Sequence, residues 1–171
     1  SLITRLGEET AFLVAALILL WCVDKRRGYY VLFVGFVGVL SNQFLKLFCR
    51  VPRPWVLDPE FTIVESAREA ATGYSFPSGH TQSAVGTFGS IAYTCKNKLC
   101  RYLAIAAAVL VPFSRMYLGV HTPADVLVAA VIAVMLIFLL RPLVYADKPM
   151  NIPALLAGMF LLAIGYLCFT Q

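Results

Sequence analysis

The chain has 171 residues, the size of a single domain, and its composition excludes an ordinary soluble protein. Hydrophobic residues make up 60% of it, charged residues only 13%, and the mean hydropathy is +0.81. Soluble domains carry about 25% charged residues, so these values indicate a membrane protein. The formal net charge is +5, but the basic residues stand in short clusters between apolar runs. Such clusters are typical of membrane flanks and argue against nucleic-acid binding.

Six segments of the chain are predicted to be membrane-spanning helices. They are residues 10–23, 29–45, 78–95, 103–117, 124–140 and 152–169. The third is rich in Gly, Ser, Thr and Ala, which suits a helix packed closely inside a bundle. The stretch 50–74 is too polar to cross the bilayer, and we expect a short interfacial helix around 61–71. The predicted fold is therefore all-α: one integral-membrane domain over residues 1–171, built as a six-transmembrane-helix bundle.

The basic residues predict which side of the membrane each connection faces. Six spans place both termini on one side and the connections 24–28, 96–101 and 141–148 on the other. These connections hold eight of the 14 basic residues against two acids: Lys25, Arg26, Arg27, Lys96, Lys98, Arg101, Arg141 and Lys148, with Asp24 and Asp147. The positive-inside rule makes their side cytoplasmic. The outer side carries the other six basic residues and seven acids: Arg5, Lys46, Arg50, Arg53, Arg68, Arg115, Glu8, Glu9, Asp58, Glu60, Glu65, Glu69 and Asp125.

The five cysteines show neither a CxxC pair nor the spacing of metal ligands, so we expect no metal site among them. Cys49 and Cys168 share the outer side, and the sequence leaves open whether they pair. Because the chain begins with Ser1, we expect its start to be trimmed or processed. The first apolar run lacks a small-residue cleavage site and is not interpreted as a signal peptide.

The motif Phe76-Pro77-Ser78-Gly79-His80 stands at the start of the third apolar segment. Ser78 is a preferred helix cap, and Gly79 leaves a backbone N–H exposed. A helix start of this kind binds anions, because its free N–H groups and the helix dipole both point at the ligand. His80 brings a titratable imidazole to the same place. The plainer interpretation is a capped helix whose histidine forms a local hydrogen bond.

Two further stretches, 46–54 and 114–125, fall on the same outer face. They supply the cations Lys46, Arg53 and Arg115 at helix ends. Together with Ser78 and the N–H of Gly79, these cations can surround a phosphoryl group. The alternative for the three cations is that they extend from helix ends to the lipid head groups.

His121 is followed four residues later by Asp125, at the start of the fifth apolar segment. This spacing lets a first-turn carboxylate reach one ring nitrogen, which fixes the tautomer and raises the basicity of the other nitrogen. An imidazole held in this way is a nucleophile, and His80 is then the natural general acid. The alternative is a plain turn, with Thr122 as helix cap and Asp125 as first-turn acid.

The spacing of these residues resembles a known signature. Lys46-x6-Arg53-Pro54, then Pro77-Ser78-Gly79-His80, then Ser114-Arg115-x5-His121-x3-Asp125 is similar to the tripartite signature of the type-2 phosphatidic acid phosphatase superfamily, over residues 46–125. The resemblance implies a metal-independent phosphatase without a cofactor, working through a phosphohistidine on His121. His80 would be the acid and Asp125 the orienting carboxylate. The phosphate would be held by Lys46, Arg53, Ser78, Gly79 and Arg115.

The resemblance also limits the substrates. Those of the membrane branch include phosphatidic acid, phosphatidylglycerol phosphate, undecaprenyl pyrophosphate and sugar phosphates. The short chain resembles small bacterial lipid phosphatases. We therefore expect a multi-pass protein of a bacterial plasma membrane, with an extracytoplasmic active site and a lipid phosphate or pyrophosphate as substrate.

Other functions stay open at this point. They are a lipid phosphotransferase, a sugar-phosphate phosphatase with the same site, and a non-catalytic protein that binds or transports an anion. The pairing of His121 with Asp125, opposite His80, argues against mere binding, which needs no acid and nucleophile. The head group and the oligomeric state also stay open.

Overall fold

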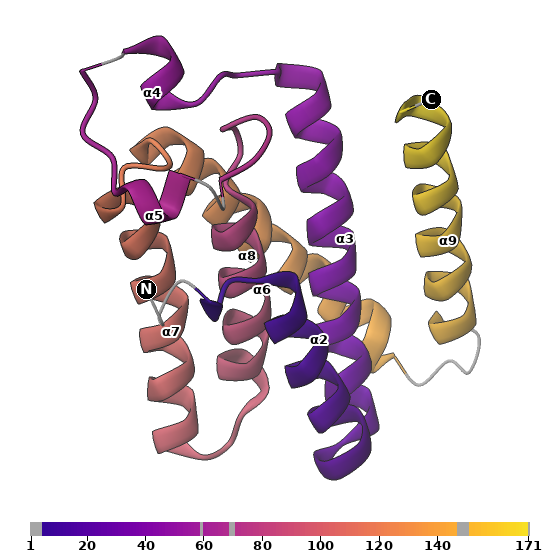
Figure 1. The fold of residues 1–171 in the computed structure, drawn as a ribbon. Coiled ribbons are helices and arrows are strands. Elements are labelled where there is room, and N and C mark those ends of the chain that lie inside the picture. The colour runs from indigo at the N-terminus through magenta and orange to yellow at the C-terminus, as the bar shows by residue number, and fades with distance from the viewer. Residues whose placement is uncertain (1–4, 59, 69–70, 147–150, 171) are drawn as a thin grey trace.

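The computed structural model describes residues 5–58, 60–68, 71–146 and 151–170, and over these residues it is all-helical (Figure 1). In chain order the elements are α2 (Glu9–Ile18), the π-helical turn η1 (Leu19–Val23), α3 (Lys25–Cys49), α4 (Pro54–Leu57), α5 (Glu65–Arg68), α6 (Gly79–Thr94), α7 (Lys98–Tyr117), α8 (Pro123–Tyr145) and α9 (Asn151–Thr170). All six predicted segments lie on helices. The predicted all-α class is therefore confirmed.

The ends of these helices follow from local sequence. Ser78 accepts a hydrogen bond from the N–H of Thr81 at the start of α6, and Thr122 accepts one from Asp125 at the start of α8. Each cap satisfies an N–H group that a helix start leaves unpaired. At its C-terminal end, α3 is terminated by Arg50, whose φ of 49° lies in the left-handed region.

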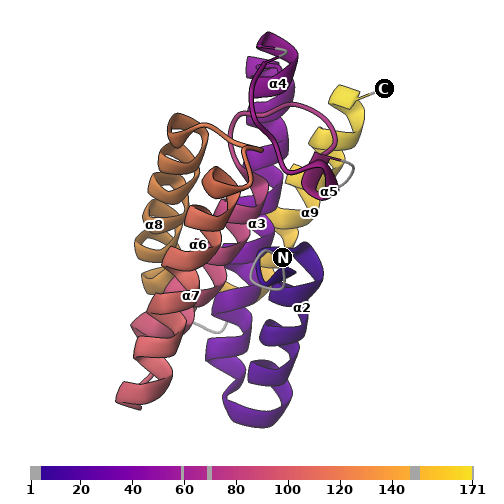
Figure 2. The ribbon, with the colours of Figure 1, turned by 60° about the vertical axis from the view of Figure 1, so that its left-hand side comes forward.

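Helix α6 is the interior helix of the bundle. It packs against α3, α7 and α8 (Figure 2). Its small side chains are buried, although many of them are polar. Ala84 and Ser90 are fully buried, and a Cβ added at Gly86 would lie 3.4 Å from Val34 of α3. Small residues let the helix backbones approach this closely. The predicted interior helix at 78–95 is thereby confirmed.

The helices have the length and surface of a membrane protein. By length and composition, Lys25–Leu57, Lys98–Tyr117 and Pro123–Tyr145 can cross a bilayer. Glu9–Val23 and Ile152–Cys168 are apolar but shorter. Large apolar side chains on the outside of the bundle are exposed, among them Trp21, Phe138 and Phe160. A soluble monomer rarely exposes so much apolar surface, whereas lipid covers it in a membrane.

Two expectations about the connections need correction. The interfacial helix expected around 61–71 is only the four-residue α5, and residues 69–70 lie outside the described part. Most basic residues expected in loops instead lie in helices. Lys25, Arg26 and Arg27 form the first turn of α3, which Asp24 caps, and Lys98 and Arg101 stand in that of α7, which Asn97 caps. Of the third cluster, Asp147 and Lys148 also lie outside the described residues.

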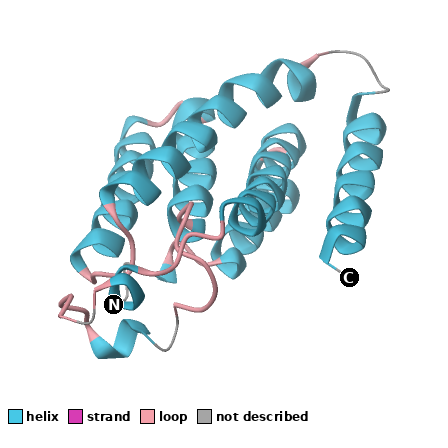
Figure 3. Ribbon diagram, turned by 90° about the horizontal axis from the view of Figure 1, so that it is seen from above, coloured by secondary structure: helices cyan, strands magenta, loops and turns pink. Residues whose placement is uncertain are grey.

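Helix α9 lies at the edge of the bundle, against α3 and α8 (Figure 3). It carries Cys168, whereas Cys49 is the last residue of α3. Both thiols are free, so the structure contains no disulfide between them.

Candidate active site

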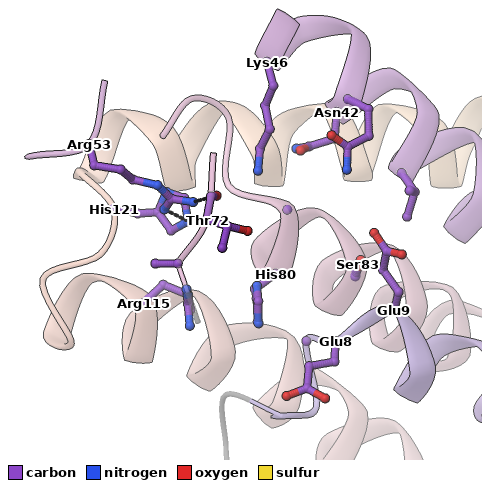
Figure 4. A pocket seen from close by; sticks show the side chains of 15 residues that line it. Glu8, Glu9, Asn42, Lys46, Arg53, Thr72, His80, Ser83, Arg115 and His121 are labelled. Carbon is purple, nitrogen blue, oxygen red and sulfur yellow. Dashed lines mark hydrogen bonds between the residues drawn. The ribbon is translucent and has the colours of Figure 1, made fainter. Parts of the chain in front are cut away.

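The three signature stretches meet at one end of the bundle and enclose a cavity of about 260 Å³ (Figure 4). They come from the last turns of α3 and α7, the start of α6, and the segments that follow α3 and α7. Six of the eight predicted site residues line the cavity: Lys46, Arg53, Gly79, His80, Arg115 and His121. The other two, Ser78 and Asp125, are buried and do not line it.

Asp125 lies behind His121 and holds several groups at once. Its Oδ2 is 3.4 Å from Nδ1 of His121, and the two side chains are buried. The same oxygen accepts hydrogen bonds from the hydroxyl of Ser75 at 2.5 Å and from the N–H of Thr122 at 2.9 Å. Both interpretations of the sequence therefore hold: Asp125 is the acid of a capping box on α8, and it also faces the imidazole.

Arg53 contacts the other ring nitrogen of His121. Its Nη1 lies 3.1 Å from Nε2, and a guanidinium can only donate, so Nε2 is the acceptor. The ring proton then resides on Nδ1, toward Asp125. Arg53 also donates to the carbonyl groups of Val120, Thr72 and Gly73. Arg53 thus ties the segment before α6 to the segment before α8, and it selects the tautomer of His121.

The environment of His121 keeps its ring neutral. Burial, together with the nearby guanidinium groups of Arg53 and Arg115, lowers the pKa of His121 to about 4, although the carboxylate of Asp125 opposes this shift. At neutral pH the ring is therefore uncharged, with a lone pair on Nε2. This is the protonation state that a nitrogen nucleophile requires.

The remaining cations surround the space in front of His121. Arg115, on the last turn of α7, is 2% exposed, and within the described part of the chain its Nε has no hydrogen-bond partner. Lys46 reaches the start of α6, since a Cβ added at Gly79 would lie 3.9 Å from its Nζ. Gly79 and His80 are the first two residues of α6, where backbone N–H groups are free to bind an anion. The cavity is therefore suited to a phosphate.

The resemblance assigns Ser78 to the binding of phosphate, but the structure places its side chain outside the cavity lining. It is fully buried, and its Oγ accepts the N–H of Thr81 at 3.4 Å, so the plainer interpretation as a helix cap describes what the structure shows. Its hydroxyl stands behind the cavity wall and supports the start of α6.

Several residues at the cavity are not predicted as site residues from the sequence: Gly7, Glu8, Glu9, Asn42, Gln43, Thr72 and Ser83, with Ser75 behind them. Three of these carried a usable signal. Asn42 and Gln43 precede Lys46 by four and three residues, and Ser83 follows His80 by three, so each shares a helix face with a predicted site residue. The others reach the site through packing between segments far apart in the chain, which no local pattern reveals.

The described residues contain no group of three His, Cys, Asp or Glu side chains arranged to hold a metal ion. Among the described residues, the acids of the outer side are spread over the start of α2 with its cap Glu8, α5, α8 and the connection after α4. The charged groups that line the cavity include the three cations Lys46, Arg53 and Arg115.

The family model of the PAP2 superfamily matches residues 27–149. The chain therefore belongs to this superfamily, and the resemblance of its signature is confirmed.

Curated relatives differ in the substrates they are named for. The chain is 33% identical over 137 residues to undecaprenyl-diphosphatase BcrC of Bacillus subtilis (strain 168), covering 77% of this chain and 68% of that protein. It is 32% identical over 142 residues to a probable sphingosine-1-phosphate phosphatase of Dictyostelium discoideum, covering 75% of this chain and 34% of that protein. It is 33% identical over 109 residues to phosphatidylglycerophosphatase B of Bacillus subtilis (strain 168), covering 56% of this chain and 51% of that protein. No solved structure matches.

The protonation of His121 can be measured directly. The chain has two histidines, so the variant His80→Gln leaves His121 as the only one. In ¹⁵N-histidine NMR of this variant in detergent, we expect a neutral ring with its proton on Nδ1, and a protonation midpoint near pH 4. Asp125→Asn should lower the midpoint further, because it removes the negative charge that favours the imidazolium. A midpoint at 6.5 or above, or a proton on Nε2, would contradict this description of the site.

Proposed function

We propose that the protein is an integral-membrane phosphatase that hydrolyses the phosphate of a lipid through a phosphohistidine on His121. The observation that carries the proposal is the buried imidazole of His121, which lines a cavity together with three cations and whose Nε2 accepts a hydrogen bond from Arg53. Membership of the PAP2 superfamily supports the reaction type, and the apolar helices support a substrate held in the bilayer.

The chemistry has two steps. The lone pair on Nε2 of His121 attacks phosphorus, and an N–P bond forms while the bond to the leaving oxygen breaks. His80 takes up the proton of the bound phosphate monoanion and passes it to that oxygen. Water then attacks the phosphorus with His80 as base, the N–P bond breaks, and phosphate leaves with His121 neutral again.

The cations act on the oxygens of the phosphoryl group. Arg115, Lys46 and the N–H of Gly79 stabilise the charge that builds up on these oxygens in the transition state. Arg53 turns its donor from Nε2 of His121 to a phosphoryl oxygen as the substrate enters. Ser78 supports this cradle from behind. The three cations supply what a metal ion supplies elsewhere, so we propose that turnover needs no metal.

The proposed architecture is six spans with the active site on the outer side. Helices α3 and α7 end and α6 begins at one end of the bundle (Figure 1). Residues from these helix ends line the cavity. The basic first turns of α3 and α7 lie at the opposite ends of those helices. The positive-inside rule then places the cavity at the outer head groups of a bacterial plasma membrane. A lipid phosphate reaches the cavity there while its tail stays in the bilayer.

The assignment of the nucleophile is tested by substitution. His121→Ala should abolish phosphate release from lipid phosphates, and Asp125→Asn should reduce it by roughly 10²- to 10⁴-fold, because the imidazole loses its orienting charge. Wild-type turnover should persist in excess EDTA. Glu60→Gln, on the exposed connection before α5, serves as the control and should keep the wild-type rate. Near-wild-type turnover of a folded His121→Ala variant, or loss with EDTA that Mg²⁺ restores, would refute the mechanism.

The side of the membrane is tested by labelling. In a variant whose five cysteines are serines, a single cysteine is introduced at Asp58 or at Asn97, both of which are exposed. In sealed right-side-out vesicles, an impermeant thiol reagent should label position 58 and spare position 97. The reverse pattern would place the active site on the cytoplasmic side.

A further inference from the structure

The cavity has two chemically different ends (Figure 4). Near His121 it is lined by cations. At the end away from His121 lie Glu8, Glu9, Asn42 and Ser83, and Gln43 also lines the cavity. The proposed phosphoryl transfer uses only the first end, so the second is free for another part of the substrate.

The acidic end is built by close approach of the N-terminal segment to α6. A Cβ added at Gly7 would lie 2.8 Å from the carbonyl oxygen of His80 and 2.8 Å from Cγ1 of Val111. Only glycine permits this contact without displacement. The next two residues are Glu8 and Glu9, which are exposed and form the rim of the cavity.

The polar groups at this end have little to bind within the protein. Ser83 is 4% exposed and lines the cavity, yet within the described residues its hydroxyl forms no hydrogen bond. Over the same residues Gln43, Glu8 and Glu9 form neither side-chain hydrogen bonds nor ion pairs. Two carboxylates, an amide and a buried hydroxyl are thus available, and carboxylates accept hydrogen bonds only. A ligand group that donates hydrogen bonds would satisfy them.

The charges at the cavity limit what this group can be. Lining side chains contribute three cations (Lys46, Arg53, Arg115) and two carboxylates (Glu8, Glu9). With both histidines uncharged, the lining therefore carries a net charge of +1. Lys46 is already attracted by Glu9. One phosphoryl group at His121 uses the cations, and a second phosphate would lie against the carboxylates, where like charges repel.

We propose that the acidic end recognises a hydroxyl group of the substrate, so that the preferred substrate is a lipid phosphate monoester with a hydroxyl beside the phosphate and not a lipid diphosphate. This inference rests on the proposed function and names its substrate class. The glutamates accept the hydrogen bond of the hydroxyl, and Ser83 and Gln43 complete the site.

Two matched pairs of substrates test the preference. Farnesyl phosphate and farnesyl diphosphate differ only in the second phosphate. Lysophosphatidic acid and its 2-deoxy analogue differ only in the hydroxyl. We expect the wild-type kcat/KM to be at least about tenfold higher for the first member of each pair, since a hydrogen bond to a charged group and a like-charge contact each have effects of this size.

The glutamates are tested with Glu9→Gln and Glu8→Gln, which keep the shape and remove the charge. At least one of them should reduce the preference for farnesyl phosphate over farnesyl diphosphate about tenfold. The same variant should also reduce the preference for lysophosphatidic acid over its 2-deoxy analogue. Glu60→Gln should leave both ratios unchanged. Equal wild-type rates within each pair, or ratios that neither variant changes, would overturn this inference while leaving the phosphatase function intact. If the wild-type protein hydrolyses none of the four compounds, the proposed function fails and the inference with it.

Discussion

The guanidinium of Arg53 connects the parts of the site on which its chemistry depends. It is 6% exposed, and its nitrogens donate to carbonyl groups of Thr72, Gly73 and Val120 and to the ring of His121. The bond to Val120 is buried, and leaving a buried acceptor unpaired costs about 1–3 kcal/mol. The bonds to Thr72 and Gly73 are partly buried and join the second segment to the first. The same cation forces Nε2 of His121 to be an acceptor. Structure and reactivity at this site therefore have a common cause.

A carboxylate on the opposite side of His121 completes this arrangement. Asp125 caps α8, receives the hydroxyl of Ser75, and faces Nδ1 of His121. Because the carboxylate is fixed by a helix start, the imidazole between it and Arg53 has little freedom to turn. The interior helix α6 then brings His80 to the same cavity, and its small side chains let α3, α7 and α8 pack closely enough to enclose the site.

The sequence predicts the helices and the cationic end of the site well, because both depend on local patterns. Apolar runs, the cap at Ser78 and the four-residue spacing from His121 to Asp125 all express helix geometry. Arg53 was assigned to phosphate, and its bonds to Thr72, Gly73 and Val120 could not be foreseen, since they arise from segments brought together by folding. The same holds for Ser75 and for the glutamates, which reach the cavity only because Gly7 packs against His80. The interfacial helix predicted around 61–71 is too long: among the described residues only Glu65–Arg68 is helical, although Ala67 and Ala71 both pack against Leu118 and Val120.

The central claim is that phosphate becomes bonded to nitrogen on His121, and rapid quenching tests it most directly. Wild-type protein in detergent is mixed with a ³²P-labelled lipid phosphate, quenched in alkali within milliseconds, digested, and the labelled peptide is sequenced by mass spectrometry. We expect acid-labile, alkali-stable label on the peptide that contains His121, and none in the His121→Ala variant. Label on His80, or turnover without any labelled peptide, would contradict the account.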